Sequence, residues 1–257
     1  MCHSFTIASY QELERTLREF AKECGFSDTF TIARSILKDE EDLAKDGGSH
    51  SFDLTDGGAV EHVAAVAYPG TFAPVILAAP EASGQNHLFE LRADLMGFGW
   101  PVEWKKGTVF NARLESLLKR GGMWGEAIDA RRCAVPCDSF FESHRTETVS
   151  SRRTGKPIKR RYVFSSPDSS PLLLAAVYDG SFFSIVTTDA DPQVSSVHDR
   201  MPFVLSREQA RIWLDPESDA ETIAEVCVKA AESEPPLVIA PLDQTEESDS
   251  VTQTQLF

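Results

Sequence analysis

The second residue of the chain is a cysteine, and its position permits chemistry that an internal cysteine cannot perform. If Met1 is removed, Cys2 carries a free α-amine beside its thiol, and both groups are partly nucleophilic near neutral pH. The amine can form a Schiff base with an aldehyde, and the thiol can then close a five-membered thiazolidine ring. The other interpretation is a frayed terminus without function. A carbonyl substrate is therefore predicted only if the rest of the chain supplies partners for Cys2.

Two residues far from Cys2 in the sequence are suited to proton transfer. Glu142 follows Phe140 and Phe141, and apolar surroundings raise the pKa of a carboxyl group towards the range useful in catalysis. His198 lies in the sequence VHDRMP and is suited to act as a proton shuttle. The alternatives are a surface glutamate at a strand end and a structural histidine, and both stay open at this point.

Four further residues are candidates for ligand contacts. Asn111 and Arg113 lie at the polar start of a short predicted helix, and a guanidinium there suits a phosphate group. Trp100 and Trp104 lie among glycines and a proline in MGFGWPVEW. Aromatic rings in such a loop can stack on nucleobases, and they equally often cover a core.

The charge of the chain is unevenly distributed. A net charge of -15 argues against a nucleic-acid partner, but from Asp215 onward the chain has eleven acidic residues and one cation, Lys229. Residues 152–161, RRTGKPIKRR, carry six cations and no acid. This segment, with Arg152 and Arg153 at its start, is interpreted either as a phosphate contact or as a solvated hairpin loop.

The chain predicts a single α+β domain over residues 1–242. Ser9, Ser206 and Ser218 each begin a capping box, which marks the start of a helix. The runs RYVFSS, PLLLAAVYDG and SFFSIVTT predict an antiparallel meander of three strands. We expect strongly curved, mainly antiparallel and partly barrel-like sheets with peripheral helices, and an amino terminus threaded into a groove.

Composition restricts the class of protein. With 257 residues, 42% of them hydrophobic, the chain can bury a sizeable core, and no apolar run approaches the roughly 20 residues that span a bilayer. The start lacks a signal peptide, and five irregularly spaced cysteines suit a reducing compartment, so we expect a cytoplasmic monomer without membrane contact. Cys133, Cys137 and His144 lack a second ligand pair, so neither a metal nor a cofactor is predicted.

Four stretches together resemble one family, the SOS response-associated peptidases, also called abasic-site processing proteins. They span much of the chain and occur in the order of that family. They are Met1-Cys2, NARLES at 111–116, RRCAVPCDSFFE at 131–142 and HDRMP at 198–202. The resemblance covers about residues 1–240.

The resemblance implies a covalent reaction with DNA. Cys2 would become the amino terminus and form a thiazolidine with the ring-opened aldehyde of an abasic site in single-stranded DNA. Asn111 would orient this adduct, and Arg113 would hold a flanking phosphate. Glu142 would act as acid and base in opening the sugar, and His198 would assist proton transfer.

Further DNA contacts are assigned to Trp100, Trp104, Arg152, Arg153 and Arg200. These residues offer aromatic rings or guanidinium groups to a nucleic acid.

Several positions depart from the family pattern. His3-Ser4 replaces a glycine and an arginine that contacts DNA, and Ser143 replaces an aromatic residue after the catalytic glutamate. These changes leave the chemistry intact and weaken the hold on DNA, because His3 replaces the missing cation only when it is protonated.

The end of the chain suggests a second partner. Residues 243–257 form an acidic, polar tail that is not expected to fold alone, and it ends in Gln253-Thr254-Gln255-Leu256-Phe257. This sequence resembles the Q-x-x-L-F peptides that dock on the bacterial sliding clamp.

Two other functions stay open. One is an amidohydrolase or self-processing peptidase with an amino-terminal cysteine, in which Cys2, Glu142 and His198 serve acyl transfer. The other is a single-stranded DNA-binding protein with weakened catalysis.

Overall fold

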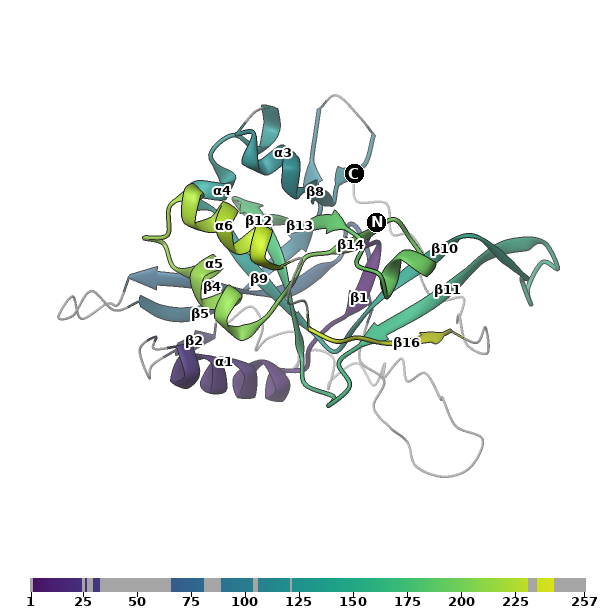
Figure 1. The fold of residues 1–257 in the computed structure, drawn as a ribbon, viewed down its shortest axis with the longest axis horizontal. Helices are drawn as coiled ribbons and strands as arrows, with labels where there is room; N and C mark the ends of the chain where they lie inside the picture. The colour runs from purple at the N-terminus through teal and green to yellow at the C-terminus, as the bar shows by residue number, and fades with distance from the viewer. Residues whose placement is uncertain are drawn as a thin grey trace, which may run out of the picture.

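The computed structural model describes residues 2–24, 26, 30–32, 66–80, 89–103, 106–120, 122–230 and 235–242. These residues form mostly strands, with a few helices packed around the outside of the sheets (Figure 1). The strands are β1 (Ser4–Thr6), β2 (Phe30–Ile32), β3 (Val66–Ala67), β4 (Phe72–Pro80), β5 (Phe89–Phe98), β6 (Trp100–Pro101), β7 (Thr108–Val109), β8 (Asn111–Arg113), β9 (Arg132–Cys137), β10 (Ser139–Ser150), β11 (Pro157–Ser165), β12 (Leu172–Asp179), β13 (Phe182–Asp189), β14 (Arg200–Pro202), β15 (Val204–Leu205) and β16 (Val238–Pro241). The helices are α1 (Tyr10–Cys24), α3 (Leu114–Leu118), α4 (Ala127–Ala130), α5 (Arg207–Leu214) and α6 (Ala220–Ala230), with 3-10 turns η1 (Gly122–Trp124) and η2 (Val194–Ser196).

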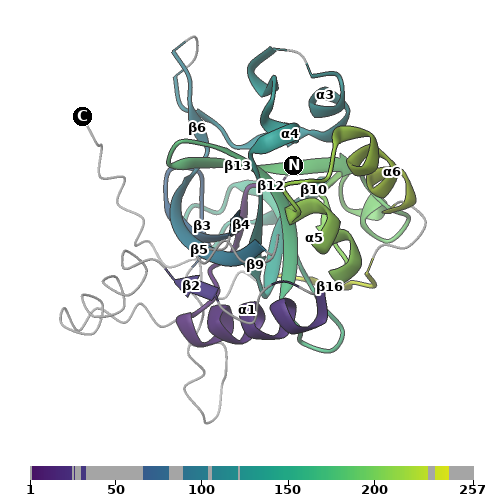
Figure 2. The same ribbon diagram turned by 90° about the vertical axis from the view of Figure 1, so that its left-hand side faces the viewer.

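Five strands close into a ring. This ring confirms the expectation of partly barrel-like sheets. Strand β13 pairs with β12, β12 with β9, β9 with β4, β4 with β5, and β5 returns to β13 through a short parallel pairing. Figure 2 shows this curved wall. A second sheet, in the order β16-β11-β10-β1-β3, extends from it. The fold class is therefore α+β with curved sheets, as predicted.

Two glycines permit the ring to close. The Gly97 amide donates to the Ser181 carbonyl at 2.8 Å, and a Cβ at Gly97 would lie 2.7 Å from the ring of Phe182. Gly99 has φ +104 and donates to the Phe183 carbonyl at 2.7 Å. A Cβ at Gly97 would displace the Phe182 ring that covers it, and a side chain at Gly99, where φ is positive, would strain the backbone. The glycines of MGFGWP thus serve the closure of the sheet.

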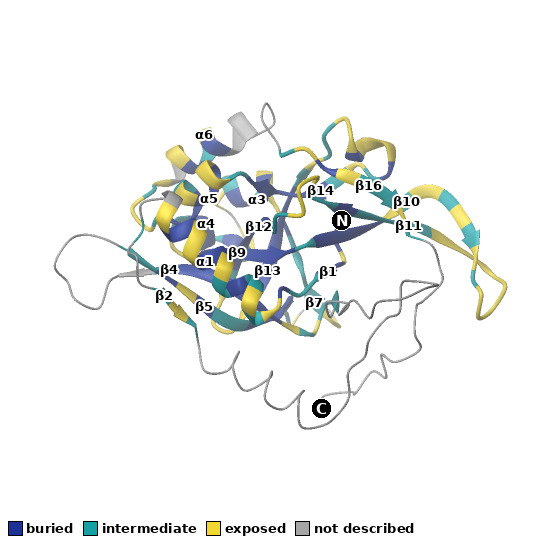
Figure 3. Cartoon of the chain, turned by 90° about the horizontal axis from the view of Figure 1, so that it is seen from below, coloured by how far each residue is buried: buried dark blue, intermediate teal, exposed yellow. Residues whose placement is uncertain are grey.

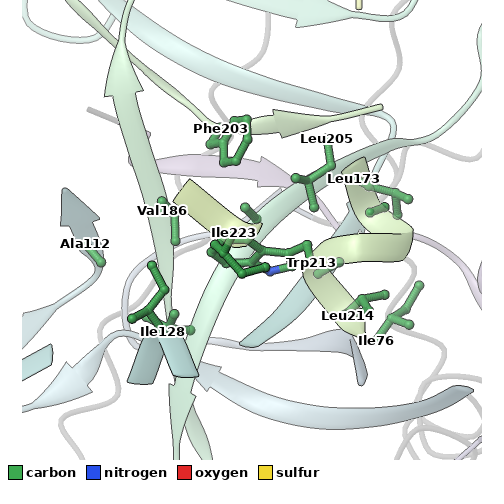
Figure 4. Packing of buried hydrophobic residues seen from close by; sticks show 14 of the residues in the cluster. Ile76, Ala112, Ile128, Leu173, Val186, Phe203, Leu205, Trp213, Leu214 and Ile223 are labelled. Carbon is green, nitrogen blue, oxygen red and sulfur yellow. The ribbon is translucent and has the colours of Figure 1, made fainter. Parts of the chain in front are cut away.

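The ring separates two hydrophobic cores because side chains alternate along each strand. On β12, for example, Leu174 belongs to the inner core with Phe5, Phe98 and Phe183, whereas Leu173 faces the helices. Trp213 of α5 lies at the centre of the outer core (Figure 4). Its indole N–H donates to the Cys133 carbonyl at 2.9 Å and so satisfies its only polar atom.

Two details of the predicted elements were wrong. Strand β11 pairs with β10 and β16 in the second sheet, so only β12 and β13 form the expected antiparallel pair. Helix α6 is capped by Asp219, whose carboxylate accepts from the Thr222 amide at 2.8 Å, and not by Ser218. The caps at Ser9 and Ser206 are present as predicted. No helix in the described part of the chain is both long and apolar enough to cross a bilayer.

A buried arginine ties the helices to the ring. The Arg132 guanidinium, on β9, donates to the carbonyls of Trp213 at 2.7 Å and Asp215 at 2.6 Å, and also to Ile128 and Asp129. These carbonyls lie at or near the carboxyl ends of α4 and α5, where backbone oxygens lack helical partners. One side chain therefore satisfies the ends of two helices.

Replacing Arg132 with methionine should destabilise the protein by ~3 kcal/mol or more, because several buried carbonyls lose their donors. Thermal unfolding measures the effect. The neighbouring Arg131→Met is the control, since among the described residues the Arg131 side chain makes one partly exposed ion pair, with Asp179 at 3.4 Å, and its loss should cost less than ~0.5 kcal/mol. Equal losses for the two variants would contradict the anchoring role of Arg132.

Candidate active site

The amino-terminal strand β1 lies inside the second sheet, between β10 and the edge strand β3. It pairs on one side with β10, with Ser4 opposite Phe141 and Phe5 opposite Phe140, and on the other side with β3. Phe5 is fully buried in the inner core. The amino terminus is therefore held beside β10 and β14, as Figures 1 and 3 show. This agrees with the expectation of a terminus inserted into the fold.

Asn111 contacts Cys2 directly. Its amide nitrogen donates to the Cys2 carbonyl at 2.9 Å, which fixes the orientation of the amide group. The amide oxygen of Asn111 is buried and has no hydrogen-bond partner among the described residues. It is available to accept a hydrogen bond from a group in the site. Asn111 belongs to strand β8, and the expectation that it begins a helix was wrong, since α3 starts only at Leu114.

Cys2 and Glu142 are both buried, and the charge of Glu142 acts on the Cys2 thiol. Cys2 is 0% exposed, and burial followed by the negative charge of Glu142 raises the pKa of its thiol well above the usual range. Glu142 is 4% exposed, and burial raises its pKa to about 7, against the opposing positive charge of the chain's amino terminus. At neutral pH this carboxyl group is therefore both an acid and a base. It lies inside strand β10, so the alternative of a surface glutamate is wrong.

His198 approaches the same terminus from the segment between η2 and β14. Its Nδ1 accepts from the Arg200 amide at 3.0 Å and lies 3.0 Å from an Asp199 carboxylate oxygen. Burial, followed by the positive charge of the amino terminus, lowers the pKa of His198. The imidazole is then mostly neutral at pH 7 and can accept a proton.

The pairing around β13 brings the distant motifs together. Strand β8 lies on one side of β13 and β14 on the other, with Thr187 aligned with both Arg113 and Pro202. Arg113 is exposed at the end of β8, two residues after Asn111. The structure thus collects Cys2, Asn111, Glu142 and His198 around the amino terminus and leaves Arg113 accessible at the edge.

Other predicted DNA contacts are placed differently. Trp100 is 6% exposed and packs on Trp124 with ring centroids 4.9 Å apart, so it belongs to the core and its ring cannot stack on a base. Trp104 lies outside the described residues. Arg152 and Arg153 are exposed in the loop between β10 and β11.

Arg200 also departs from its predicted role. Its guanidinium donates to both carboxylate oxygens of Glu115, at 2.9 and 3.0 Å, and to Asp189 at 2.6 Å. Only 11% of the side chain is exposed. Two carboxylates therefore neutralise the cation that was predicted to contact DNA. Arg200 joins β14 to α3 and helps to position the neighbouring His198.

Sequence reasoning missed Arg161 as a member of the site. Its guanidinium donates to the Ser4 hydroxyl at 2.8 Å and lies over the Phe141 ring, 5.0 Å from the centroid. Burial, followed by the charge of Arg161, lowers the pKa of His3. His3 is therefore a poor substitute for a cation, whereas Arg161 is a permanent one. The six cations of residues 152–161 indicated a possible phosphate contact. Only the strand register shows which of these cations reaches the site.

Comparison with known proteins identifies the family. The family model described as SOS response associated peptidase (SRAP) matches residues 37–245. The chain belongs to the SRAP family. The match begins after Cys2 and covers the strands that carry Asn111, Glu142 and Arg161, together with His198.

Related SRAP proteins share part of this sequence. The abasic site processing protein YoqW of Bacillus subtilis is 27% identical over 143 residues, which is 52% of this chain and 59% of YoqW. YedK of Escherichia coli, with the same description, is 28% identical over 144 residues, 51% of this chain and 59% of YedK. The chain thus spans about six-tenths of the length of these two relatives.

Solved structures share the fold. A protein of Bordetella bronchiseptica aligns with a TM-score of 0.56 and 16% identity over 94% of this chain and 100% of that one. A phage-related protein of the same organism gives a TM-score of 0.53 and 24% identity over 74% of this chain and 87% of that one. At these identities the likeness concerns the fold alone.

The raised pKa of Glu142 predicts a stability effect. The folded chain holds this proton more tightly than the unfolded chain, so Glu142 reduces the free energy of unfolding as pH rises from about 4.5 to about 7. Glu142→Gln, which stays neutral, should be more stable than the wild type by ~1–3 kcal/mol at pH 8 and nearly equal to it at pH 4.5. Urea unfolding of the unprocessed chain at both pH values measures this difference.

Glu115→Gln is the matched control for this experiment. Against the effect of burial, hydrogen bonds from Arg200 lower the pKa of Glu115, so its carboxylate stabilises the fold at neutral pH. This variant should lose stability at pH 8. A loss of stability in Glu142→Gln as well would contradict the burial effect at Glu142.

Proposed function

We propose that this protein links Cys2 covalently to abasic sites in single-stranded DNA after removal of Met1. The observation that carries the proposal is the buried cluster at the amino terminus, where Asn111 holds the Cys2 carbonyl at 2.9 Å beside a glutamate with a pKa of about 7. Membership of the SRAP family supports it, and so do the descriptions of YoqW and YedK as abasic site processing proteins.

The reaction follows from the groups that surround Cys2. The protonated Glu142 donates its proton to the sugar ring oxygen, the resulting carboxylate takes the proton of the C1′ hydroxyl, and the aldehyde at C1′ is released with Glu142 protonated again. The α-amine of Cys2 attacks this carbon, and loss of water, with its oxygen protonated by the same carboxyl group, gives an imine. The Cys2 sulfur then bonds to the imine carbon, His198 accepts the thiol proton, and the imine nitrogen is protonated. The product is a thiazolidine with water as the leaving group.

Two features of the site assist these steps. The raised pKa of the Cys2 thiol keeps it protonated, so sulfur attacks only when a neighbouring base accepts its proton. The buried amide oxygen of Asn111 can accept a hydrogen bond from the nitrogen of the adduct. Arg113 and Arg161 provide positive charge for the phosphates on either side of the lesion.

Crosslinking to DNA tests the proposal. Processed protein, with the loss of Met1 verified by mass spectrometry, should give a shifted band on a denaturing gel with an oligonucleotide that contains one abasic site. Cys2→Ala should give none, and Glu142→Gln should react about 10²–10⁴-fold more slowly. Protein that retains Met1 should also fail, because an amide nitrogen forms no Schiff base.

Cys137→Ala is the control for thiol specificity, because Cys137 is a buried free cysteine of the same inner core and should not be required. Two results would refute the proposal. The first is that fully processed wild-type protein forms no crosslink, and the second is that protein which retains Met1 forms the same stable crosslink. Tight binding without a crosslink would instead favour a DNA-binding protein with weakened catalysis.

We also propose a catalytic unit at residues 1–242 with a tail that docks on the bacterial sliding clamp. Gln253 to Phe257 lies outside the described residues, and its support is the Q-x-x-L-F pattern alone. A flexible tether would raise the local concentration of the enzyme at the nucleoid. Deletion of 253–257 should abolish clamp capture in a pull-down and leave crosslinking unchanged. Undiminished capture, or equal capture by a chain with these five residues scrambled, would refute the docking.

A further inference from the structure

Residues 143–161, called the basic arm here, extend from the site as a two-stranded ribbon made of parts of β10 and β11 (Figure 1). The arm contains seven cations and one acid, Glu147, although the whole chain has a net charge of -15. Most of its residues are exposed or intermediate in burial (Figure 3). The arm is therefore a strongly positive feature on an acidic protein.

The arm has little support from the core. Strand β16 pairs with β11 only from Tyr162 to Ser165, so beyond that point the two strands of the arm pair only with each other among the described residues. Ile158, its largest aliphatic side chain, is exposed. A two-stranded ribbon is only marginally stable when it stands alone. Because the arm buries little apolar surface, a contribution to the stability of the fold does not account for its presence. Its cations point to a polyanionic partner.

A bulge fixes the arm relative to the site. The strand register shifts between Ser143 and Thr148, so that residues 144–147 of β10 lie opposite Arg160 alone. Within the bulge, His144 Nδ1 accepts from the amide of Glu147 at 2.9 Å. The Arg145 amide donates at 3.0 Å to the carbonyl of Val197, next to His198. The arm thus begins directly after Glu142 and is attached to the segment that carries His198.

The single acid of the arm is neutralised within it. The Glu147 carboxylate accepts from Arg160 at 2.6 Å and from the Tyr162 hydroxyl at 2.7 Å. Both contacts lie at the bulge, between the site and the end of the arm. The cations Arg152, Arg153 and Lys156 are exposed around the turn, at the opposite end of the arm from its only carboxylate.

We propose that the basic arm is a second DNA-binding element, which holds the backbone of the single strand several nucleotides away from the lesion. The inference rests on the proposed function for the identity of the site. From Tyr162, opposite Glu142, to Pro157 is five residues, or ~17 Å along an extended strand. At the ~3.4 Å per nucleotide of a stacked strand this span corresponds to about five phosphates, and an extended single strand covers it with fewer, so the end of the arm lies several phosphates from the reacting sugar.

Substrate length provides the test. The variant Arg152→Gln/Arg153→Gln/Lys156→Gln removes three exposed charges, and crosslinking rates at subsaturating protein are compared on 5- and 30-nucleotide strands with a central abasic site. The wild type should favour the long strand, and the variant should lose ~10-fold or more on the long strand and remain unchanged on the short one. For binding of the 30-mer, the slope of log K against log salt should fall by about 2, as expected for three charges on a single strand.

A matched control separates the position of the charges from their number. Arg15→Gln/Arg18→Gln/Lys22→Gln removes three exposed cations from α1 and should keep the wild-type preference for long strands. Equal effects of the arm variant on both lengths, or equal loss in the α1 variant, would overturn the proposal. If no protein crosslinks, the proposed function fails, and anisotropy with an undamaged 30-mer still decides whether the arm binds DNA.

Discussion

The pairing of β1 between β10 and β3 is the interaction on which the site depends. A three-residue strand at the start of a chain would ordinarily fray, but here both of its edges are paired and Phe5 is buried in the inner core. Residues 4–6 are consequently held from both sides, like a strand inside a sheet. Cys2 can be placed against Asn111 and Glu142 only because the residues that follow it are fixed in this way.

Burial then sets the chemical state of the groups. The same low-dielectric environment raises the pKa of Cys2 and Glu142 and lowers that of His198, since in each case the charged form is disfavoured. A neutral thiol, a partly protonated carboxyl group and a neutral imidazole therefore coexist near pH 7. Proton transfers among such groups avoid creating isolated buried charges.

Local sequence signals predicted much of the fold. The pairing of strands that lie far apart in the sequence could not be predicted in this way. The caps at Ser9 and Ser206 depend on neighbouring residues and were predicted correctly. The assignment of β11 to a meander was wrong because its partners, β10 and β16, are set by side-chain packing across the whole domain.

The same limit applies to the candidate site. Family motifs indicated Cys2, Asn111, Glu142 and His198 as a group, but no local pattern shows that Trp100 is buried or that Arg200 is neutralised by Glu115. The register of β10 against β11, with Arg161 opposite Ser143, decides which cation of the basic run reaches Ser4, and no local sequence pattern specifies that register here.

The position of β1 between β10 and β3 also has a consequence for biosynthesis. Glu142 of β10 is synthesised 140 residues after Cys2. At roughly 5–20 residues per second, the terminus waits about 7–28 s before its main neighbour exists. During that interval the sheet that encloses residue 2 has not yet formed, and the reaction proposed for Cys2 requires the loss of Met1. The order of synthesis therefore leaves a period in which this proposed processing can precede the burial of residue 2.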